Sequence, residues 1–461
     1  MSEAGWTRAS TAPSTVAAAS LVSLLLFSAC TVERADPIGG PGSRPNVLIF
    51  ITDDQRSDML PALPRTLEWF RPGTRYPNAV ATTPLCCPSR ASVFTGRYAH
   101  NHGVLTNDDG ERLEPRATVQ SALRRAGYRT AIAGKYLNEW PLERPPPMFD
   151  QWAIDSPFPY GNGYLREPFN VNGELREVPY ATDFIARAAT GFLRDFERDD
   201  QRPWFLYVAP FAPHEPAIPP PGRPTPAPKV PGLPEGVEQP PQGAPDFLSR
   251  TIELSGSELR TLAADQVRAL GPVDELVNRV MSAVESLGEL DRTLAFFLSD
   301  NGYLLGDHGA QGKSLPYLES VRIPLLVRWP TAVDRPAVDD RLAANVDVAP
   351  TILEAAGIRG ALPVDGRSLT GQPRSRILLE SFRTRSSPIP SWTALLTPGW
   401  EYVEYSRKGR DGFAEYYDLR ADPGQTQNLV SDAIGAERLS RLNDALEALR
   451  RCGSSGAARC P

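Results

Sequence analysis

The stretch "NVLIFITDDQ" (residues 46 to 55) decides the fold class, because its apolar run is typical of a strand buried on both faces. Four other runs share this character: "YRTAIAG" (128 to 134), "PWFLYVAP" (203 to 210), "TLAFFLS" (293 to 299) and "IPLLVRW" (323 to 329). Helical patterns separate the runs, at 118 to 127, 181 to 197 and 273 to 291. This alternation predicts an α/β protein with a large, mostly parallel sheet sandwiched by helices.

Ionisable and ligand-type side chains follow four of these predicted strands. They are Asp53 and Asp54, Lys135, His214 in "FAPHEP", and Asp300 and Asn301. Because ligands bind outside the carboxyl ends of parallel strands, we expect these residues to meet at one edge of the sheet. Singly, the Asp53 pair could cap a helix and the Asp300 segment could form a turn, but their joint occurrence favours a site.

The residue types at this edge predict a hard metal ion. Asp53, Asp54, Asp300 and Asn301 offer only oxygen ligands, which select Ca²⁺ or Mg²⁺. Arg90, Lys135, His214 and Lys313 would add a cationic pocket suited to a tetrahedral oxyanion, sulfate or phosphate. For the other histidines, His100, His102 and His308, packing or capping is the favoured interpretation.

Two adjacent cysteines stand in "CCPSRASVFTG" (residues 86 to 96), and disulfide geometry makes a bond between neighbours unfavourable. Pro88 suits the first turn of a helix, so Cys86 is expected at a helix N-terminus, where it could be a thiolate nucleophile. A soft thiolate is a poor companion for a hard cation, and an oxygen nucleophile would fit better.

Residues 45 to about 430 resemble the formylglycine-dependent sulfatase family, of the alkaline-phosphatase-like superfamily. The signature Cys-x-Pro-Ser-Arg followed by Thr-Gly is present in "CCPSRASVFTGR". It is accompanied in order by "PNVLIFITDDQ", "AGKYLNEW", "APFAPHEP", "LSDNGYLLGDHG", "GKSLPYLESVRIPLLVRWP" and "EYYDLRADPGQTQNL". The doubled Cys, "GRYAHNH" and "GKYLNEW" look most like N-acetylglucosamine-6-sulfatases and heparan endosulfatases.

The resemblance implies a role for each matching residue. Cys86 would be oxidised to formylglycine by a formylglycine-generating enzyme. It would then bind Ca²⁺ together with Asp53, Asp54, Asp300 and Asn301. Arg90 would hold the formylglycine, and Lys135, His214 and Lys313 would bind the sulfate and assist the leaving group. The implied activity is sulfuric ester hydrolysis on a sulfated sugar, such as a glucosamine 6-sulfate.

The implied mechanism uses the two hydroxyls of the hydrated aldehyde, one to attack sulfur and the other to expel sulfate. One departure concerns the second step, because many sulfatases read Gly-Lys-x-His where this chain has Leu137. The base that replaces this histidine is left open, and His102 is a candidate. The rival activities are a phosphomonoester or phosphodiester hydrolase of the same superfamily and, from another class, a lipoprotein that binds sulfated glycans without turnover.

The ends of the chain indicate export and a second, smaller domain. Residues 1 to 29 read as a signal peptide ending in small residues before Cys30, which predicts a cell-surface lipoprotein anchored there, with plain secretion as the alternative. A flexible tether at 30 to 44 would precede a catalytic domain at 45 to 375 and an α+β subdomain with an antiparallel sheet at 376 to 461.

Three further features complete the sequence prediction. The Pro-rich segment at 216 to 245 is interpreted as a surface loop beside the pocket rather than an interdomain linker, because strands of one sheet would flank it. Cys452 and Cys460 are expected to form a disulfide. The net charge of -6 and the pI near 5.5 argue against a nucleic-acid surface, which needs excess cations.

Overall fold

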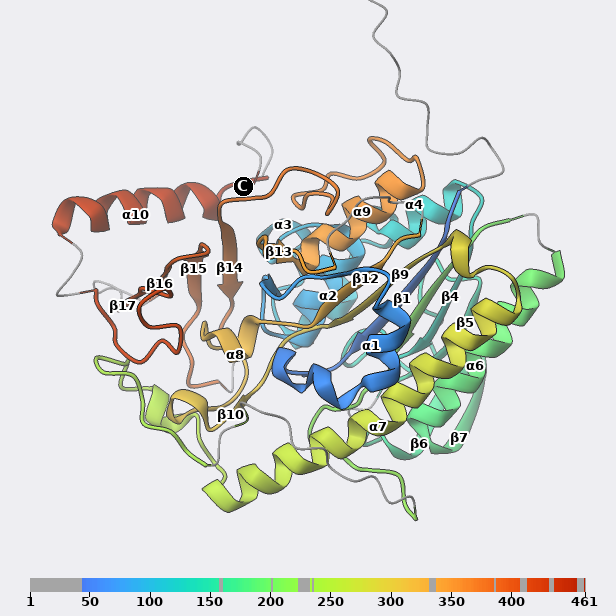
Figure 1. The fold of residues 1–461 in the computed structure, drawn as a ribbon, viewed down its shortest axis with the longest axis horizontal. Helices are drawn as coiled ribbons and strands as arrows, with labels where there is room; N and C mark the ends of the chain where they lie inside the picture. The colour runs from blue at the N-terminus through green and yellow to red at the C-terminus, as the bar shows by residue number, and fades with distance from the viewer. Residues whose placement is uncertain are drawn as a thin grey trace, which may run out of the picture. The chain divides into compact units, whose positions relative to one another are not determined.

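A nine-stranded sheet forms the centre of this computed structural model, in the order β2-β12-β9-β1-β8-β4-β5-β6-β7 (Figure 1). Its strands are β1 (Asn46–Thr52), β2 (Thr74–Arg75), β4 (Arg129–Gly134), β5 (Gln151–Asp155), β6 (Leu165–Val171), β7 (Glu174–Tyr180), β8 (Trp204–Ala209), β9 (Thr293–Ser299) and β12 (Leu325–Arg328). The five central strands, from β9 to β5, are mutually parallel, and the outer ones are antiparallel to their neighbours. The predicted mostly parallel sheet is confirmed.

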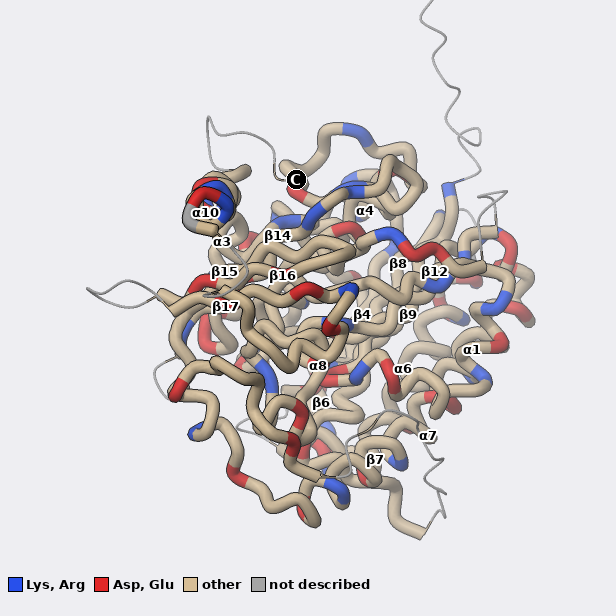
Figure 2. The backbone as a smooth tube through the Cα atoms, turned by 60° about the vertical axis from the view of Figure 1, so that its left-hand side comes forward, with Lys and Arg blue, Asp and Glu red and all other residues tan. Residues whose placement is uncertain are grey.

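The structure describes residues 44–156, 161–199, 202–222, 233, 236–330, 337–384, 387–406, 413–430, 435–453 and 460. The predicted signal peptide, the Cys30 anchor and all of the tether but residue 44 lie outside these residues, as does part of the Pro-rich segment. Within the described residues, every helix is too short or too polar to cross a bilayer. Figure 2 shows acidic and basic positions interspersed along the described chain.

Helices cover both faces of the sheet because alternate residues of each strand point to opposite sides. Leu48 and Phe50 of β1 join a core with the helices on one side, and Val47, Ile49 and Ile51 join the other core. The first layer consists of α1 (Pro64–Phe70), α6 (Ala181–Phe196) and α7 (Gly256–Ser286); the second consists of α2 (Cys86–Thr95), α4 (Val119–Arg125) and α9 (Val348–Ala355). Burial on both faces explains why the sequence of β1 is continuously apolar.

Helix α7 is longer than the sequence pattern predicted. The predicted segment, 273 to 291, starts after Pro272, whereas the helix begins at Gly256 and carries this proline inside it. A capping box fixes the true start: the Ser255 side chain accepts from the Glu258 backbone, and the Glu258 carboxylate accepts from the Ser255 backbone. The apolar face buried against the sheet outweighs the hydrogen bond that the proline removes.

A separate antiparallel sheet lies near the C-terminus, as predicted. It consists of β14 (Ile377–Ser381), β15 (Trp392–Leu396), β16 (Glu401–Tyr405) and β17 (Ala414–Tyr417), followed by α10 (Ala436–Arg450). The Trp392 indole donates to the Ser314 carbonyl at 2.7 Å, and the Glu380 amide donates to the Thr82 carbonyl at 2.9 Å. This sheet therefore contacts two segments that carry predicted site residues; the domain boundary at 375 stays a prediction.

The remaining short elements connect these layers. They are β3 (Ala79–Val80), α3 (Ala99–His102), β10 (Leu304–Leu305), β11 (Gln311–Gly312), α8 (Leu318–Val321) and β13 (Ala343–Ala344). The Pro-rich segment connects β8 to β9, which both belong to the nine-stranded sheet, so the interdomain linker is excluded. Its described part contacts the loop after β10, where the Glu238 amide donates to the Gly306 carbonyl at 2.8 Å.

Candidate active site

The predicted site residues meet at the carboxyl edge of the parallel strands. Asp53 and Asp54 follow β1, and Asp300 and Asn301 follow β9, whose Ser299 is paired with Thr52. The Asp54 amide donates to an Asp300 carboxylate oxygen at 3.1 Å, which fixes the two strand ends to each other. All four side chains are fully buried, so the carboxylates require charged or metal partners.

Helix α2 brings Cys86 and Arg90 to the same cluster. The helix begins at Cys86, as predicted, and the two residues lie one turn apart on one face. The Cys86 Sγ atom lies 3.3 Å from Asp53 Oδ1. The Arg90 guanidinium donates to Asp300 at 2.8 Å and to Asp53 at 3.2 Å. The spacing Cys-x-x-x-Arg therefore places a cation beside both strand ends.

Two lysines and one histidine also surround the carboxylates. Lys135, after β4, forms an ion pair with Asp53, and Lys313, after β11, forms one with Asp54. Lys313 Nζ also lies 2.9 Å from Cys86 Sγ. His214, after β8, places Nε2 at 3.4 Å from Asp54, while its Nδ1 contacts the Glu215 carbonyl. All the cationic residues predicted from the sequence are thus brought together.

The environment of Cys86 does not favour a free thiolate. Burial raises the pKa of its thiol, and the adjacent Asp53 carboxylate raises it further, against the lowering by Lys135 and Lys313. The helix N-terminus alone does not overcome this effect, so the interpretation of Cys86 as a low-pKa thiolate finds no support here. Cys87 is also buried, which raises its pKa to about 12; its sulfur accepts the Asn138 amide at 3.0 Å.

The donor set fits a hard divalent cation. Two buried oxygens, Asp54 Oδ2 and Asn301 Oδ1, accept no hydrogen bond among the described residues, although Asp54 Oδ2 lies 3.4 Å from His214 Nε2. Ligand atoms of Asp53, Asp54, Cys86 and His214 all lie within 4.8 Å of one another. Buried oxygens normally have partners, and a cation would supply the missing ones. Asp54 also has a positive φ of 62°, and such uncommon backbone conformations cluster at functional sites.

Three residues of this region were missed by the sequence reasoning. Asn345 donates to Ser89 Oγ at 2.8 Å and accepts the Thr82 amide at 3.0 Å, so it braces the start of α2. Tyr303 and Glu215 hydrogen-bond to each other beside His214. Asn345 lies far from every motif in sequence, but Tyr303 and Glu215 directly follow "DNG" and "PH", and that adjacency could have identified them.

His102 makes local contacts through both ring nitrogens. Its Nδ1 accepts the Val104 amide at 3.1 Å, so Nε2 carries the proton and lies 3.1 Å from Ser92 Oγ. Burial lowers its pKa to about 3. These local contacts favour a packing role for His102, and its part as the base that replaces the histidine missing at Leu137 stays a prediction.

His308 likewise makes local contacts. Its Nε2 lies 2.7 Å from the Glu319 carboxylate, and its ring stacks on Tyr317 at 4.2 Å between centroids.

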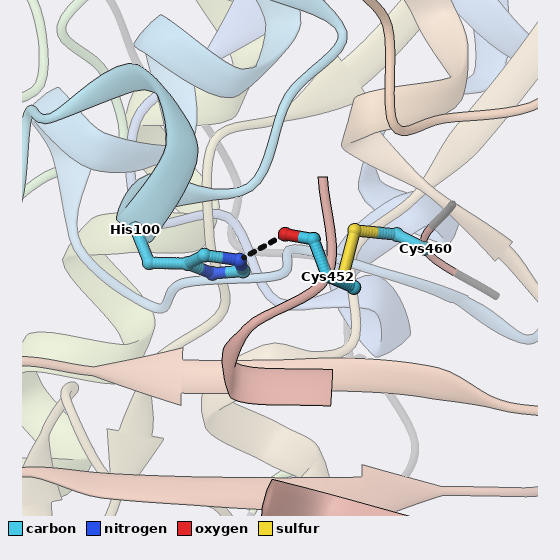
Figure 3. A group of neighbouring side chains, drawn as sticks. All are labelled: His100, Cys452 and Cys460. Atoms are coloured by element: carbon cyan, nitrogen blue, oxygen red, sulfur yellow. Dashed lines mark hydrogen bonds between the residues drawn. A yellow bond between two sulfur atoms is a disulfide. The ribbon is translucent and has the colours of Figure 1, made fainter. Parts of the chain in front are cut away.

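A second group of close donor atoms, His100, Cys452 and Cys460, lies at the C-terminal end of the described chain (Figure 3). The two sulfurs are bonded to each other, which confirms the predicted disulfide and leaves no thiolate for a metal. His100 instead bridges two segments: its Nδ1 lies 2.9 Å from Glu380 and its Nε2 lies 3.1 Å from the Cys452 carbonyl. It therefore ties the disulfide-closed end of the chain to β14.

We expect this bridge to make stability depend on pH. Against the lowering by burial, Glu380, the Cys452 carbonyl and Asp365 raise the net pKa of His100 above its usual value of about 6.5. A group whose pKa is higher in the folded than in the unfolded protein stabilises the folded state. This stabilisation is complete at pH values below the unfolded-state pKa and is lost as the pH rises through the folded-state pKa. His100→Gln should therefore cost about 1 kcal/mol of unfolding free energy at acidic pH and progressively less in alkaline buffer.

Denaturant unfolding across this pH range measures the effect. A double-mutant cycle with Glu380→Gln should give a coupling that vanishes at high pH, and a coupling independent of pH would contradict the charged bridge. Neighbouring His102, with its low pKa, stays neutral throughout.

Comparison with known proteins identifies the family. Residues 45–358 match the family described as Sulfatase, and residues 306–452 match the C-terminal region of N-sulphoglucosamine sulphohydrolase. The extracellular sulfatase SULF-1 homolog of Drosophila melanogaster is 33% identical over 71% of this chain, but the match covers only 31% of that relative. The N-acetylglucosamine-6-sulfatase of Homo sapiens is 29% identical over 89% of this chain and 85% of its own length.

Two solved structures share the fold. One, a protein in complex with its substrate D-glucosamine-2-N,6-O-disulfate, superposes with a TM-score of 0.74 at 24% identity, over 90% of this chain and 99% of that one. The other, a phosphonate monoester hydrolase from Silicibacter pomeroyi, has a TM-score of 0.68 at 22% identity, over 87% and 94%. With residues 45–358, more than half of the chain, matched by one family and the motif residues gathered at one sheet edge, the chain belongs to the sulfatase family.

Proposed function

We propose that this protein is a sulfuric ester hydrolase whose nucleophile is formylglycine made from Cys86. The observation that carries the proposal is the position of the Cys86 side chain. Its sulfur contacts both Asp53 and Lys313, at the centre of a buried cluster with two unpartnered oxygens. An oxygen nucleophile in place of that sulfur would lie beside a hard cation and a fixed ammonium group.

The metal proposed for this site is Ca²⁺, with Mg²⁺ as the alternative, held by Asp53, Asp54, Asp300, Asn301 and the modified Cys86. Such an ion supplies positive charge that polarises the sulfate ester. The hydrated aldehyde supplies two hydroxyls on one carbon, so that sulfate can leave without direct attack by water.

The chain's own residues hold and protonate the reacting groups. Arg90 and Lys135 both contact Asp53, so they fix its carboxylate and offset its charge. Lys313 reaches the position of the nucleophile and can bind a sulfate oxygen there. His214 donates through Nδ1 to a backbone carbonyl and faces the cluster with Nε2, which must also be protonated to deliver a proton to the departing alcohol. Burial lowers the pKa of His214, which makes that doubly protonated ring a stronger acid.

The proposed substrate is a sulfated sugar such as a glucosamine 6-sulfate. Support comes from relatives named N-acetylglucosamine-6-sulfatase and from the structural neighbour that binds a sulfated glucosamine. The extracellular sulfatase among the relatives supports export of this chain. A formylglycine-generating enzyme would be required for maturation, and Cys30 is proposed as a lipid anchor; both proposals rest on the sequence alone.

Nitrophenyl sulfate and nitrophenyl phosphate test the reaction class. We expect kcat/KM for the sulfate to exceed that for the phosphate by about 100-fold, because the chain matches the sulfatase family and selectivity reflects differential transition-state binding. Steady-state kinetics on protein expressed with the maturation enzyme gives both values. A preference for the phosphate would favour the phosphoester hydrolase, and binding of sulfated sugars without any turnover would favour the non-catalytic lipoprotein.

A further inference from the structure

The approach to the site is defined by its two partly exposed members. His214 and Lys313 expose 17% and 14% of their side chains, whereas Asp53, Arg90, Lys135 and Asp54 expose at most 1%. A substrate must therefore reach the nucleophile past His214 and Lys313. Groups fixed next to these two residues will contact the part of the substrate that surrounds the ester.

A carboxylate is fixed at this position. Glu215, half-buried, directly follows His214 in the chain, and its carbonyl contacts His214 Nδ1. Its carboxylate accepts a hydrogen bond of 2.5 Å from the Tyr303 hydroxyl through Oε2. Tyr303 is 4% exposed and lies two residues after Asn301, with its own amide bound to the Glu319 carbonyl at 2.8 Å. Tyr303 thus holds one oxygen of Glu215.

The surroundings of Glu215 are rigid on the side of His214. The Phe211 ring stacks on the His214 ring at 4.4 Å between centroids, and the Tyr164 hydroxyl donates to the His214 carbonyl at 2.7 Å. The ring and the carbonyl of His214 are therefore both held, and the Tyr303 hydroxyl holds the Glu215 carboxylate itself. A fixed charge close to a site acts on substrate selection more strongly than a mobile one.

We propose that Glu215, oriented by Tyr303, is a specificity residue that selects sulfate esters of amino sugars with a free ammonium group and disfavours those with a second sulfate nearby. This inference rests on the proposed sulfatase function. Among the described residues, the charged side chains that contact Cys86 are Lys313 and the proposed metal ligand Asp53, so the Glu215 carboxylate beside His214 introduces a different preference. The Glu215 carboxylate would attract an ammonium group on the sugar and repel a second sulfate.

Three sugars test the proposal: glucosamine 6-sulfate, its N-acetyl derivative and D-glucosamine-2-N,6-O-disulfate. We define the selectivity as the ratio of kcat/KM for the free amine to kcat/KM for the disulfate, at a pH where the amine is protonated. The variant Glu215→Gln keeps an oxygen for Tyr303 but removes the charge. It should lower the selectivity about tenfold, because attraction and repulsion each change an equilibrium a few-fold in exposed pairs.

Tyr303→Phe removes the hydrogen bond that orients Glu215 and should lower the selectivity by about threefold. Glu177→Gln, a matched change on β7 where Glu177 pairs with Arg166, should leave it at the wild-type value. High salt should reduce the wild-type selectivity, since salt screens both interactions. In the wild type, kcat/KM for the N-acetyl sugar should lie between the values for the free amine and for the disulfate.

If Glu215 had only a structural role, Glu215→Gln would lower kcat/KM equally for all three sugars and leave the selectivity unchanged. That result would overturn the proposal. The dissociation constants of the three sugars from the Cys86→Ala variant measure the same preference at the level of binding, without turnover. The inference therefore stays testable if hydrolysis is absent. Hydrolysis of nitrophenyl sulfate together with an unchanged selectivity would reject the role of Glu215 and leave the sulfatase proposal intact.

Discussion

Cys86→Ala is expected to lower kcat/KM for sulfate-ester hydrolysis by at least about 10³-fold, because it removes the nucleophile itself. The Cys86 side chain contacts both Asp53 and Lys313, so its removal takes the reacting atom out of the cluster. Cys86→Ser supplies one hydroxyl instead of the two of the hydrated aldehyde. We therefore expect at most a single slow turnover from this variant. Stopped-assay kinetics with nitrophenyl sulfate measures both variants, and mass spectrometry of the Cys86 peptide detects the aldehyde in the wild type.

Cys87→Ala is the matched control for this experiment. Cys87 is equally buried and next in the chain, but its sulfur contacts Asn138 rather than the cluster. We expect a loss of stability of about 1 kcal/mol with kcat changed by less than about threefold. An active wild-type enzyme with an unmodified thiol at Cys86 would refute formylglycine as the nucleophile.

Removal of the metal by a chelator is expected to abolish turnover, with a loss of about 10³-fold that added Ca²⁺ reverses. The physical reason is the charge of the cluster. Three carboxylates, Asp53, Asp54 and Asp300, face three cations, Arg90, Lys135 and Lys313, so their formal charges cancel at 3 - 3 = 0. A divalent cation makes the site net positive, as binding of an anionic ester requires.

Asp54→Asn tests the same site without a chelator. Asn tolerates the positive φ at this position, so the change alters the ligand charge with little backbone strain. We expect weaker Ca²⁺ binding, seen by calorimetry, and a melting temperature that no longer rises with added Ca²⁺. Asp58→Asn, whose carboxylate pairs with Arg56, is the control and should bind Ca²⁺ like the wild type. Full activity of metal-free enzyme would contradict the proposal.

The limits of the sequence reasoning are clearest at helix α7 and at Asn345. The predicted helix began at residue 273, whereas α7 begins at Gly256, where "SGSE" at 255 to 258 carries a capping signal. Asn345 braces Ser89 across 256 residues of sequence. A contact of this kind is set by the packing of distant segments, so no local pattern reveals it.

The sequence by itself determined five strands of the large sheet, the residues at its carboxyl edge and the family. Buried parallel strands must be continuously apolar, and their ends converge whatever the loops do. Tertiary structure alone decided the pairing of each cation with its carboxylate, the unpartnered oxygens of Asp54 and Asn301, and the placement of Glu215 against Tyr303. These depend on ångström-scale distances between segments far apart in the chain, which residue type and spacing do not specify.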